Sequence, residues 1–545
     1  MMGNPQPIYI LQEGTSRSKG RDALSSNIQA ARAIADAVRT TLGPRGMDKM
    51  LVDNLGDVVV TNDGATILKE LDVSHPAAKM LIEVAKTQEQ EAGDGTTTSV
   101  VLAGALLHEA EKLVDDVHPT ILVRGFGLAA AKAQAILQAT AFSLNVRSDK
   151  DVRSIAATSM YSKSATTDRE SLADLAVRAV RAVAEERDGK VVADLDQIQI
   201  VKKHGGGVED TQLVEGLIVD KERVHENMPS AVRDARIAIL ETALEIKKPE
   251  IEAHIEITDP ERLREFLDQE EATLRAKVDK VVAAGANVVF CQKGIDDLAQ
   301  HFLAKQGVYA VRRVKKSDME KLARAAGGRI VGHLDDLEGS DLGRASLVEE
   351  RKVGEDAMTF VTGCRNPKSV SILVRGGTEH VADELERTLD DALSVTADVL
   401  EDDGRALAGG GAPEIELALQ LRKYAAGVGG REQLAIRAFA DALEVIPHTL
   451  AQNAGLDPIQ VLVDLRAAHE KGQATAGINV FTGKVVDMRK EAVLEPLRVK
   501  SQAIAAATEV ASMILRIDDT IAAKAGPGGG KGKMPGAGGE DFGGD

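Results

Sequence analysis

The sequence contains no tryptophan, and aromatic residues make up only 2% of its 545 residues. Its hydrophobic cores must therefore consist mainly of Ala, Val, Leu and Ile. Few aromatic side chains are present to stack on bases, and the formal net charge of −18 offers little cationic surface to phosphates. Both features argue against nucleic-acid binding. The acidity itself suits either the solubility of a large particle or an acidic functional surface.

Cysteine is almost absent, since only Cys291 and Cys364 occur. No CxxC pair or Cys/His spacing indicates zinc, and at most one disulfide could form. Residues 1–11 lack the basic patch and apolar run of a signal peptide. No run of about 18 apolar residues predicts a membrane span. We therefore expect a cytoplasmic protein without a membrane partner.

The length exceeds the roughly 250–300 residues at which one hydrophobic core stops growing, so several domains are expected. Helical spacing of apolar residues and one β-branched run mark the first section, which is mostly helical. Its predicted helices are 26–42, 76–91, 97–114 and 120–141, with a strand at 58–60. After about residue 403 the chain returns to Ala-rich helices, and residues 526–545 form a Gly-rich tail that we expect to be flexible.

The middle of the chain alternates between short apolar runs and helical segments, which predicts an α/β layered domain. The predicted strands are 198–201, 217–219, 236–240, 288–290 and 308–311, and the predicted helices are 260–283 and 317–326. Helical ends that flank a mixed middle suggest one domain interrupted by an insertion.

Helix 260–283 has a clear start, because Thr258 and Asp259 supply a cap and Pro260 suits the first helical position. Its apolar residues form one stripe among many charges. They are Leu263, Phe266, Leu267, Leu274 and Val278. The stripe indicates either a face packed into the core or a projecting arm whose apolar side meets a partner.

Residues 93–99, GDGTTTS, precede an apolar helix and form the most informative segment. Glycine lets the backbone approach an anion closely, and amides at a helix N-terminus point toward negative charge. The hydroxyl groups add donors, and Asp94 offers an oxygen to a magnesium ion. An ordinary Thr-capped helix start has the same pattern, so both interpretations stay open for this segment alone.

Three further turns are candidates for the same site. Residues 41–46, TLGPRG, place a Gly-rich turn at a predicted helix end, and residues 61–64, TNDG, follow a strand. The triple glycine 409–411 precedes a new helix and would equally suit a hinge. No GxxxxGK[ST] loop occurs, and no GxGxxG lies between a strand and a helix. A nucleotide site in this chain would be of another type.

Two carboxylates are candidates for hydrolytic chemistry. Asp63 lies in the turn after the strand, and Asp391 lies within 386–393, a predicted helix. Splitting a phosphoanhydride needs a metal to neutralise oxygens and a carboxylate to orient or deprotonate water. Either residue alone is also explained as a solvated surface charge, and spacing in the sequence does not show that the two meet.

Together these segments resemble the signature of the chaperonins. Three of its motifs occur in the family's order, and two more match downstream: TLGPRGMDKML at 41–51, TNDGATIL at 61–68, GDGTT at 93–97, GGGAPE at 409–414 and NAGLD at 453–457. The similarity covers the chain except its extreme termini. Asn62 and the insert around 243–280 favour the archaeal group II branch, the thermosome.

The resemblance implies a site for ATP and Mg²⁺, with Asp94 as the metal ligand and Asp63 and Asp391 as carboxylates that activate water. The residues implied to contact the nucleotide are Leu42, Gly43, Pro44, Asp94, Gly95, Thr96, Thr97, Thr98, Lys163, Gly411, Asn479 and Glu495.

Each contact has an implied role. Residues 42–44 would pack on the nucleotide, 94–98 would cradle its phosphates, and Lys163 would sense the terminal phosphate. Gly411 would lie beside the ribose and base, Asn479 near the adenine and Glu495 near the ribose. The bacterial branch often has Asp at that last position.

The resemblance also implies a multidomain chaperonin fold. It comprises a mostly α-helical equatorial domain, a mixed α/β intermediate domain and an α/β apical domain with a helical lid protrusion. The implied boundaries are 1–145 and 403–525 for the equatorial domain, 146–214 and 367–402 for the intermediate domain, 215–366 for the apical domain, near 243–280 for the protrusion and 526–545 for the tail.

The implied function is ATP-driven folding of unfolded client proteins in a chamber. Identical or paralogous subunits would form two stacked rings of about eight or nine, with a built-in lid in place of a separate co-chaperonin. A stand-alone metal-dependent phosphohydrolase would explain the Asp-Gly turns but not the long insertion. A scaffolding ring that binds nucleotide without turnover is the other alternative, and Asp63, Asp94 and Asp391 weigh against it.

Overall fold

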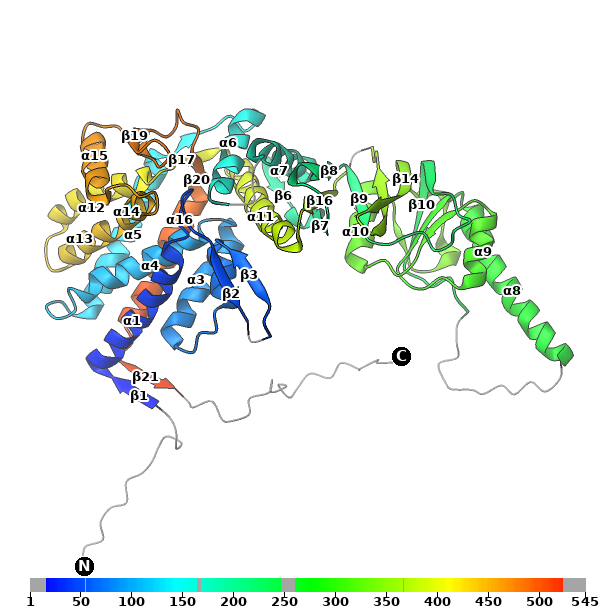
Figure 1. Cartoon of the computed structure of the whole chain (residues 1–545), viewed down its shortest axis with the longest axis horizontal. Coiled ribbons are helices and arrows are strands. Elements are labelled where there is room, and N and C mark those ends of the chain that lie inside the picture. Colours follow the sequence, from blue (N-terminus) through cyan, green and yellow to red (C-terminus); the bar gives the residue numbers. More distant parts are fainter. Residues whose placement is uncertain (1–15, 54, 164–167, 247–259, 366, 523–545) are drawn as a thin grey trace, which may run out of the picture.

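The computed structural model describes residues 16–522 apart from 54, 164–167, 247–259 and 366. The chain is elongated: a helical body lies at one end, a mixed body in the middle and a sheet-containing body at the other end (Figure 1). The predicted cap at Thr258 and Asp259 and the predicted tail 526–545 lie outside the described residues.

The helical body is formed by both ends of the chain. Its helices are α1 (Gly20–Arg39), α2 (Gly64–Glu70), α3 (Pro76–Ala92), α4 (Thr96–Glu111), α5 (Pro119–Thr140), α12 (Ala412–Val428), α13 (Glu432–Leu443), α14 (Val445–Asn453), α15 (Pro458–Glu470) and α16 (Leu497–Leu515). One hydrophobic core contains buried side chains from α1, α3, α4 and α5 together with α12, α13 and α16. Segments from the two ends of the sequence therefore share a single core.

Short strand pairs lie around this body. They are β1 (Ser16–Lys19) with β21 (Asp519–Ala522), β2 (Lys49–Val52) with β3 (Val58–Thr61), β18 (Ala476–Asn479) with β19 (Lys484–Asp487), and β17 (Arg405–Ala408) between β4 (Phe142–Ser143) and β20 (Leu494–Pro496). The β1–β21 pair joins the described ends of the chain directly.

Helix α5 is the one helix among the described residues that is long and apolar enough, by composition, to cross a membrane. It packs against α12, α13 and α16, and its buried side chains include Phe126, Ala129 and Leu137. Its apolar composition is accounted for by this position within the core of the helical body.

Phe126 is fully buried, and its ring meets that of Phe439 edge to face with centroids 5.7 Å apart. We expect Phe126→Ala to lower the free energy of unfolding by about 3–5 kcal/mol, because it leaves a cavity and removes the ring contact. Denaturant unfolding measures this loss. Leu434→Ala, on the same α13 helix as Phe439 but 38% exposed, should change stability far less, and equal effects would contradict the packing argument.

The middle body packs three helices against a small sheet. Its elements are α6 (Asp149–Ser159), η1 (Met160–Ser162), α7 (Arg169–Val183), β5 (Ala184–Arg187), β6 (Lys190–Ala193), η2 (Leu195–Gln197), β7 (Ile198–His204), η3 (Val208–Asp210), β8 (Gln212–Val214), β16 (Val370–Gly376) and α11 (Glu379–Glu401), where η marks a 3-10 helix. The sheet order is β7-β16-β8, and one core contains buried residues of α6, α7 and α11.

The third body is built on a seven-stranded mixed sheet with the order β12-β11-β10-β14-β15-β9, in which β13 also pairs with β10. Its elements are β9 (Gly216–Val219), β10 (Ala231–Leu240), α8 (Pro260–Ala283), β11 (Val288–Cys291), α9 (Asp297–Lys305), β12 (Tyr309–Val311), α10 (Lys316–Ala326), β13 (Ile330–Val331), η4 (Leu334–Asp336), η5 (Gly339–Asp341), β14 (Gly343–Val353) and β15 (Asp356–Thr362). Strands β10, β11 and β12 are parallel. Their successive side chains point to opposite faces of the sheet, and each face forms its own hydrophobic cluster.

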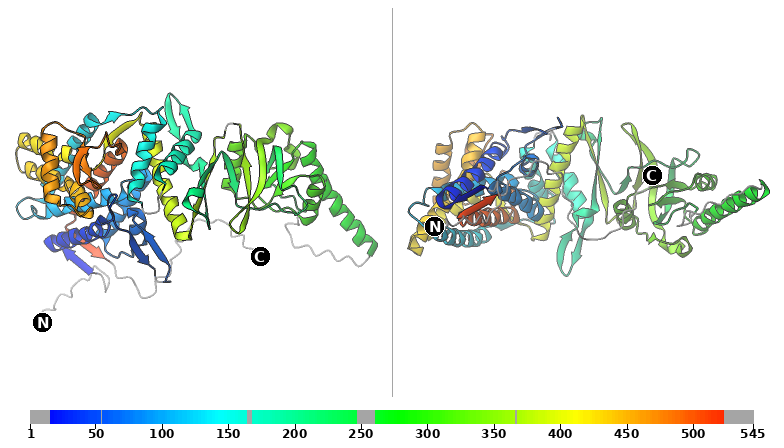
Figure 2. Two further views of the ribbon diagram at one scale, coloured as in Figure 1. Left: turned by 45° about the horizontal axis from the view of Figure 1, so that its top comes forward. Right: turned by 90° about the horizontal axis from the view of Figure 1, so that it is seen from below.

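Helix α8 divides into a packed half and a projecting half (Figures 1 and 2). Leu274 and Val278 are buried in the core of the third body. Phe266 and Leu267, nearer the helix start, are 40% and 54% exposed. The interpretation as a core-packed face therefore holds for the second half of the helix. The first half projects with these two apolar side chains exposed, and a partner for them remains a prediction.

The predicted strands and long helices are confirmed, with two corrections. The helix predicted to reach residue 42 ends at Arg39, because Thr40 caps it and a tight turn continues to Gly43, whose φ is 81°. The turn predicted at 61–64 leads into a helix, α2, that was not predicted from the sequence. Its seven residues are too few to show a clear period of 3.6.

Candidate functional site

A cavity of about 430 Å³ opens in the helical body beside the middle body. Its walls come mainly from the turn after α1, the starts of α4, α12 and α16, helix α14 and the β18–β19 hairpin. The middle body adds the end of α6, η1 and the start of α7. Nine of the residues proposed to contact a nucleotide line it. They are Leu42, Gly43, Pro44, Asp94, Gly95, Thr98, Gly411, Asn479 and Glu495.

Two helix N-termini face this cavity. Gly95 caps α4 with φ 81°, and Gly411 caps α12 with φ 78°, a left-handed conformation that favours glycine. The side chain of Asp94 accepts a hydrogen bond of 2.6 Å from the Gly95 amide, and Gln88 donates to the Asp94 carbonyl at 2.7 Å. Unpaired amides at both helix starts give the cavity an affinity for anions.

The other predicted residues lie next to the cavity rather than in its wall. Thr96 is buried, and its carbonyl accepts from Ser99 at 2.8 Å. Thr97 lies against the start of α2, where a Cβ built at Gly64 would be 2.5 Å from its hydroxyl oxygen. That close approach puts the N-termini of α2 and α4 side by side, and Asp63 caps α2.

Asp63, Lys163 and Asp391 form one buried cluster. The Lys163 Nζ lies 3.1 Å from Oδ2 of Asp391 and 3.6 Å from Oδ1 of Asp63. The exposed fractions of these side chains are 4% for Lys163, 11% for Asp63 and 18% for Asp391. The cluster joins the α2 cap, the residue after η1 and the middle of α11, three segments far apart in sequence.

The charges in this cluster act on one another. Burial raises the pKa of Asp391 well above its usual value, and although Lys163 opposes this, Asp63 and Asp94 add to it. Burial also acts to raise the pKa of Asp63, but Lys163 and the Thr66 amide lower it overall. The pKa of Lys163 is raised by Asp391 and Asp63 against the effect of burial. Lys163 thus acts on all three carboxylates, together with Arg387 near Asp63 and Lys500 near Asp94.

Burial raises the pKa of Asp94 as well, more than the Gly95 amide and the nearby Lys163 lower it. No group of three or more His, Cys, Asp or Glu side chains that could hold a metal ion alone occurs in the described part of the chain. Mg²⁺ commonly binds through one or two carboxylates together with phosphate oxygens. Asp94, next to a helix start that attracts anions, fits that mode of binding.

Contacts from the middle body position the cluster. Thr61 donates a hydrogen bond of 3.0 Å to Glu384 on α11, and Asn62 donates to the carbonyl of Ser162. Gly93, just before Asp94, has φ 62°, and a Cβ there would lie 2.0 Å from the Cβ of Ser394 on α11. Helix α11 can therefore bring Asp391 close to the Asp94 loop only because residue 93 is glycine.

Lys500 was not predicted from the sequence. It lines the cavity and forms ion pairs with Glu414 at 2.8 Å and Glu495 at 2.9 Å. The available signal was a pair of cations, Arg498 and Lys500, at the start of an Ala-rich apolar helix. A row of side chains in cation–π and tilted ring contact at the cavity was not predicted either. The guanidinium of Arg45 lies 5.2 Å from the Phe481 ring, which lies 6.2 Å from Tyr161. Both aromatic residues line the cavity, in a chain with few aromatics.

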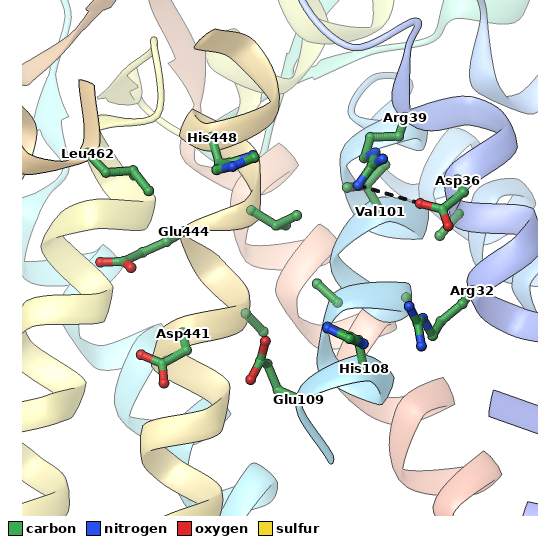
Figure 3. A pocket seen from close by; sticks show the side chains of 15 residues that line it. Arg32, Asp36, Arg39, Val101, His108, Glu109, Asp441, Glu444, His448 and Leu462 are labelled. Carbon is green, nitrogen blue, oxygen red and sulfur yellow. Dashed lines mark ion pairs between the residues drawn. The ribbon is translucent and has the colours of Figure 1, made fainter. Parts of the chain in front are cut away.

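A second cavity of about 510 Å³ lies between α1, α4 and the α13–α14 region (Figure 3). Arg32, Arg39 and His108 face Asp36 and Glu109 there, and Arg39 pairs with Asp36 at 3.5 Å. Charges of both signs line it, and no predicted site residue does. It lacks the Gly-capped helix starts that give the first cavity its preference for anions.

Comparison with known proteins gives consistent matches. The model of the TCP-1/cpn60 chaperonin family matches residues 34–525. The chain is 61% identical to thermosome subunit beta of Archaeoglobus fulgidus, over 97% of this chain and 98% of that protein. It is 60% identical to a thermosome subunit of Methanopyrus kandleri, over 96% of each. Among solved structures it resembles an open-state monomer of a group II chaperonin from Methanococcoides burtonii, with a TM-score of 0.57 and 46% identity, covering 78% of this chain and 100% of that one.

Proposed function

The chain belongs to the TCP-1/cpn60 chaperonin family and is a subunit of an ATP-dependent chaperonin, and from this premise we propose that the cavity beside Asp94 binds ATP with Mg²⁺ and that Asp63 and Asp391 promote its hydrolysis. The multidomain chaperonin fold expected from the sequence is confirmed by the structural match. One observation carries the proposal: turns from distant parts of the chain line a single cavity, with the Asp63–Lys163–Asp391 cluster beside it.

The proposed contacts follow from the cavity wall. Residues 42–44 pack on the nucleotide, and 94–98 receive its phosphates at the start of α4. Gly411 lies beside the ribose and base, Asn479 near the adenine and Glu495 near the ribose. Lys163 senses the terminal phosphate. Asp94 would hold Mg²⁺, which neutralises phosphate oxygens when it is bound.

Hydrolysis then depends on carboxylates from two bodies. Asp63 belongs to the helical body and Asp391 to α11 of the middle body. Each is held by Lys163, which keeps both oriented toward one point. A carboxylate so placed orients an attacking water and accepts its proton. Since the pair forms only when the two bodies meet, catalysis is coupled to domain closure.

The three bodies support a division into domains. We assign 1–145 and 403–525 to the equatorial domain, 146–214 and 367–402 to the intermediate domain and 215–366 to the apical domain. Separate hydrophobic cores support this assignment. The α8 arm, with exposed Phe266 and Leu267, would form part of the lid protrusion near 243–280.

The subunit belongs to an oligomeric chaperonin that binds client proteins. We further propose that it assembles in the cytoplasm into two stacked rings of about eight or nine subunits, closed by the built-in lid without a separate co-chaperonin. Electron microscopy of the purified protein with and without ATP tests this assembly. We expect double rings that are open without nucleotide and closed with ATP, whereas monomeric particles under both conditions would refute it.

Nucleotide binding has its own test. In titration calorimetry we expect Mg²⁺ to strengthen ATP binding to the wild-type protein, because Asp94 would hold the metal and the metal would neutralise phosphate charge. Asp94→Asn should lose most of that gain while still binding ATP in the presence of EDTA. Asp72→Asn, a substitution at an exposed site in the same body, should behave as the wild type. An undiminished Mg²⁺ effect in Asp94→Asn would remove Asp94 from the metal site.

A further inference from the structure

Lys500 occupies an unusual position for a lysine. It lies in the first turn of α16 with its side chain only 7% exposed, and it borders the proposed ATP cavity. Its ammonium group lies between two carboxylates, 2.8 Å from Oε1 of Glu414 and 2.9 Å from Oε2 of Glu495. Burying a lysine is costly unless its charge is paired, so this arrangement needs both acidic partners.

Glu495 is held at its backbone and at one carboxylate oxygen. Strand β20 pairs with β17, which sets Glu495 opposite Leu407. Lys500 contacts Oε2, while Oε1 lies against Gly409, where a Cβ would be 3.2 Å away. The carboxylate therefore has a fixed direction at the cavity wall, with one oxygen engaged by the lysine.

Glu414 supplies the second half of the arrangement. It lies in the first turn of α12, whose Gly411 cap borders the cavity, and its side chain is 5% exposed. Its Oε1 pairs with Lys500, whereas its buried Oε2 has no hydrogen-bond partner within the described part of the chain. Lys500 thus ties α12, β20 and α16 together at the end of the cavity assigned to the ribose.

Resting on the function proposed above, we propose that Lys500 is a positioning residue that keeps the Glu495 carboxylate charged and aimed at the ribose hydroxyl groups of the nucleotide. A charged acceptor forms a markedly stronger hydrogen bond than a neutral one. Burial raises the pKa of Glu495, and Lys500 is the main group that opposes this rise. Without the lysine, Glu495 would be both free to rotate and more readily protonated.

The test compares ATP with 2′,3′-dideoxy-ATP, which lacks the hydroxyl groups that Glu495 would bind. In the wild type we expect the KM for the dideoxy nucleotide to be about 10- to 100-fold higher than the KM for ATP. This is the range expected when hydrogen bonds to a charged group are lost. In Lys500→Met the ratio of these two KM values should fall toward one. The kcat for ATP should change by a smaller factor than this ratio. Lys500→Arg should retain part of the preference.

Two further variants control for folding and charge. Lys500→Met leaves two buried carboxylates unpaired. The ratio of the two KM values is therefore also measured in Lys500→Met/Glu414→Gln, where the amide removes one of these buried negative charges. Lys490→Met removes a lysine that is 83% exposed and should leave the ratio unchanged. Ring assembly seen by electron microscopy identifies the variants that fold.

The outcomes separate the two proposals. A wild-type protein that does not bind ATP would refute the proposed function. ATP binding without any preference for the ribose hydroxyl groups would overturn the role of Glu495, and that of Lys500 with it. A folded Lys500→Met/Glu414→Gln protein that keeps the full wild-type preference would overturn the role of Lys500 alone.

Discussion

Asp391→Ala is expected to reduce ATP hydrolysis by about 10²- to 10⁴-fold, the usual contribution of a positioned general base. ATP binding and ring assembly should persist, because Asp391 lies outside the cavity wall and outside the core of the helical body. Its carboxylate touches Lys163 at 3.1 Å, so its removal affects the catalytic cluster rather than the contacts with the nucleotide. Steady-state phosphate release gives the rate, and calorimetry gives the affinity.

Asp390→Ala is the matched control for this change. The two aspartates are adjacent on α11, but Asp390 is exposed and has no ion pair to Lys163 among the described contacts. We expect it to hydrolyse ATP at nearly the wild-type rate. Wild-type turnover in Asp391→Ala would remove this residue from the mechanism, and loss of turnover in both variants would indicate a general disturbance of α11.

The long elements of the fold could be predicted from the sequence, because their apolar residues repeat at regular spacing over many positions. Helices α3, α4 and α5 were placed within two or three residues. The short α2 was not, although its cap, Asp63, was singled out as a site residue. A carboxylate at a helix start and one in a tight turn look alike in sequence, because both bind nearby backbone amides.

The meeting of the site residues could not be read from spacing. Thr61 and Glu384, whose hydrogen bond fixes the cluster, are 323 positions apart, with the whole third body between them in the chain. Only the resemblance to chaperonins linked Asp63 with Asp391 in advance. Lys500 was missed for a different reason. A buried lysine is recognised by the acidic partners around it, and those partners, Glu414 and Glu495, come from separate segments.

The burial of the apolar stripe on α8 could also be predicted only in part. Apolar spacing identifies the face of a helix but not how far the neighbouring body extends along it. Val278 is buried in a packed core, whereas Phe266 is 40% exposed. The packed half contacts helix α9 and the 3-10 helix η4, whose positions the stripe itself does not encode.

Gly93→Ala is expected to lower ATP hydrolysis by about 10²-fold, the cost of displacing a catalytic group by about 1 Å. A Cβ at residue 93 would lie 2.0 Å from that of Ser394, which is less than one helical turn from Asp391 on α11. Neither atom is the end of a flexible side chain, so the helix or the Asp94 loop must move. Single-turnover hydrolysis measures the chemical step directly.

Gly327→Ala separates this clash from backbone strain. Gly327 caps α10 in the left-handed conformation, as Gly93 caps α3, but a Cβ there would meet nothing within 4 Å. Both substitutions should cost about 1–2 kcal/mol in stability from the left-handed backbone. Only Gly93→Ala should impair hydrolysis, and equal rates in the two variants would show that the contact with α11 does not position Asp391.

A second change should restore the activity of Gly93→Ala. Adding Ser394→Gly removes the Cβ and hydroxyl group that the new methyl group meets, at a cost of roughly 0.5–1 kcal/mol for glycine within a helix. Hydrolysis should recover most of the lost 10²-fold even though stability falls further. A rise in activity together with a fall in stability distinguishes a positioning contact from a merely structural one. A double variant as inactive as Gly93→Ala would rule out the positioning role of this contact.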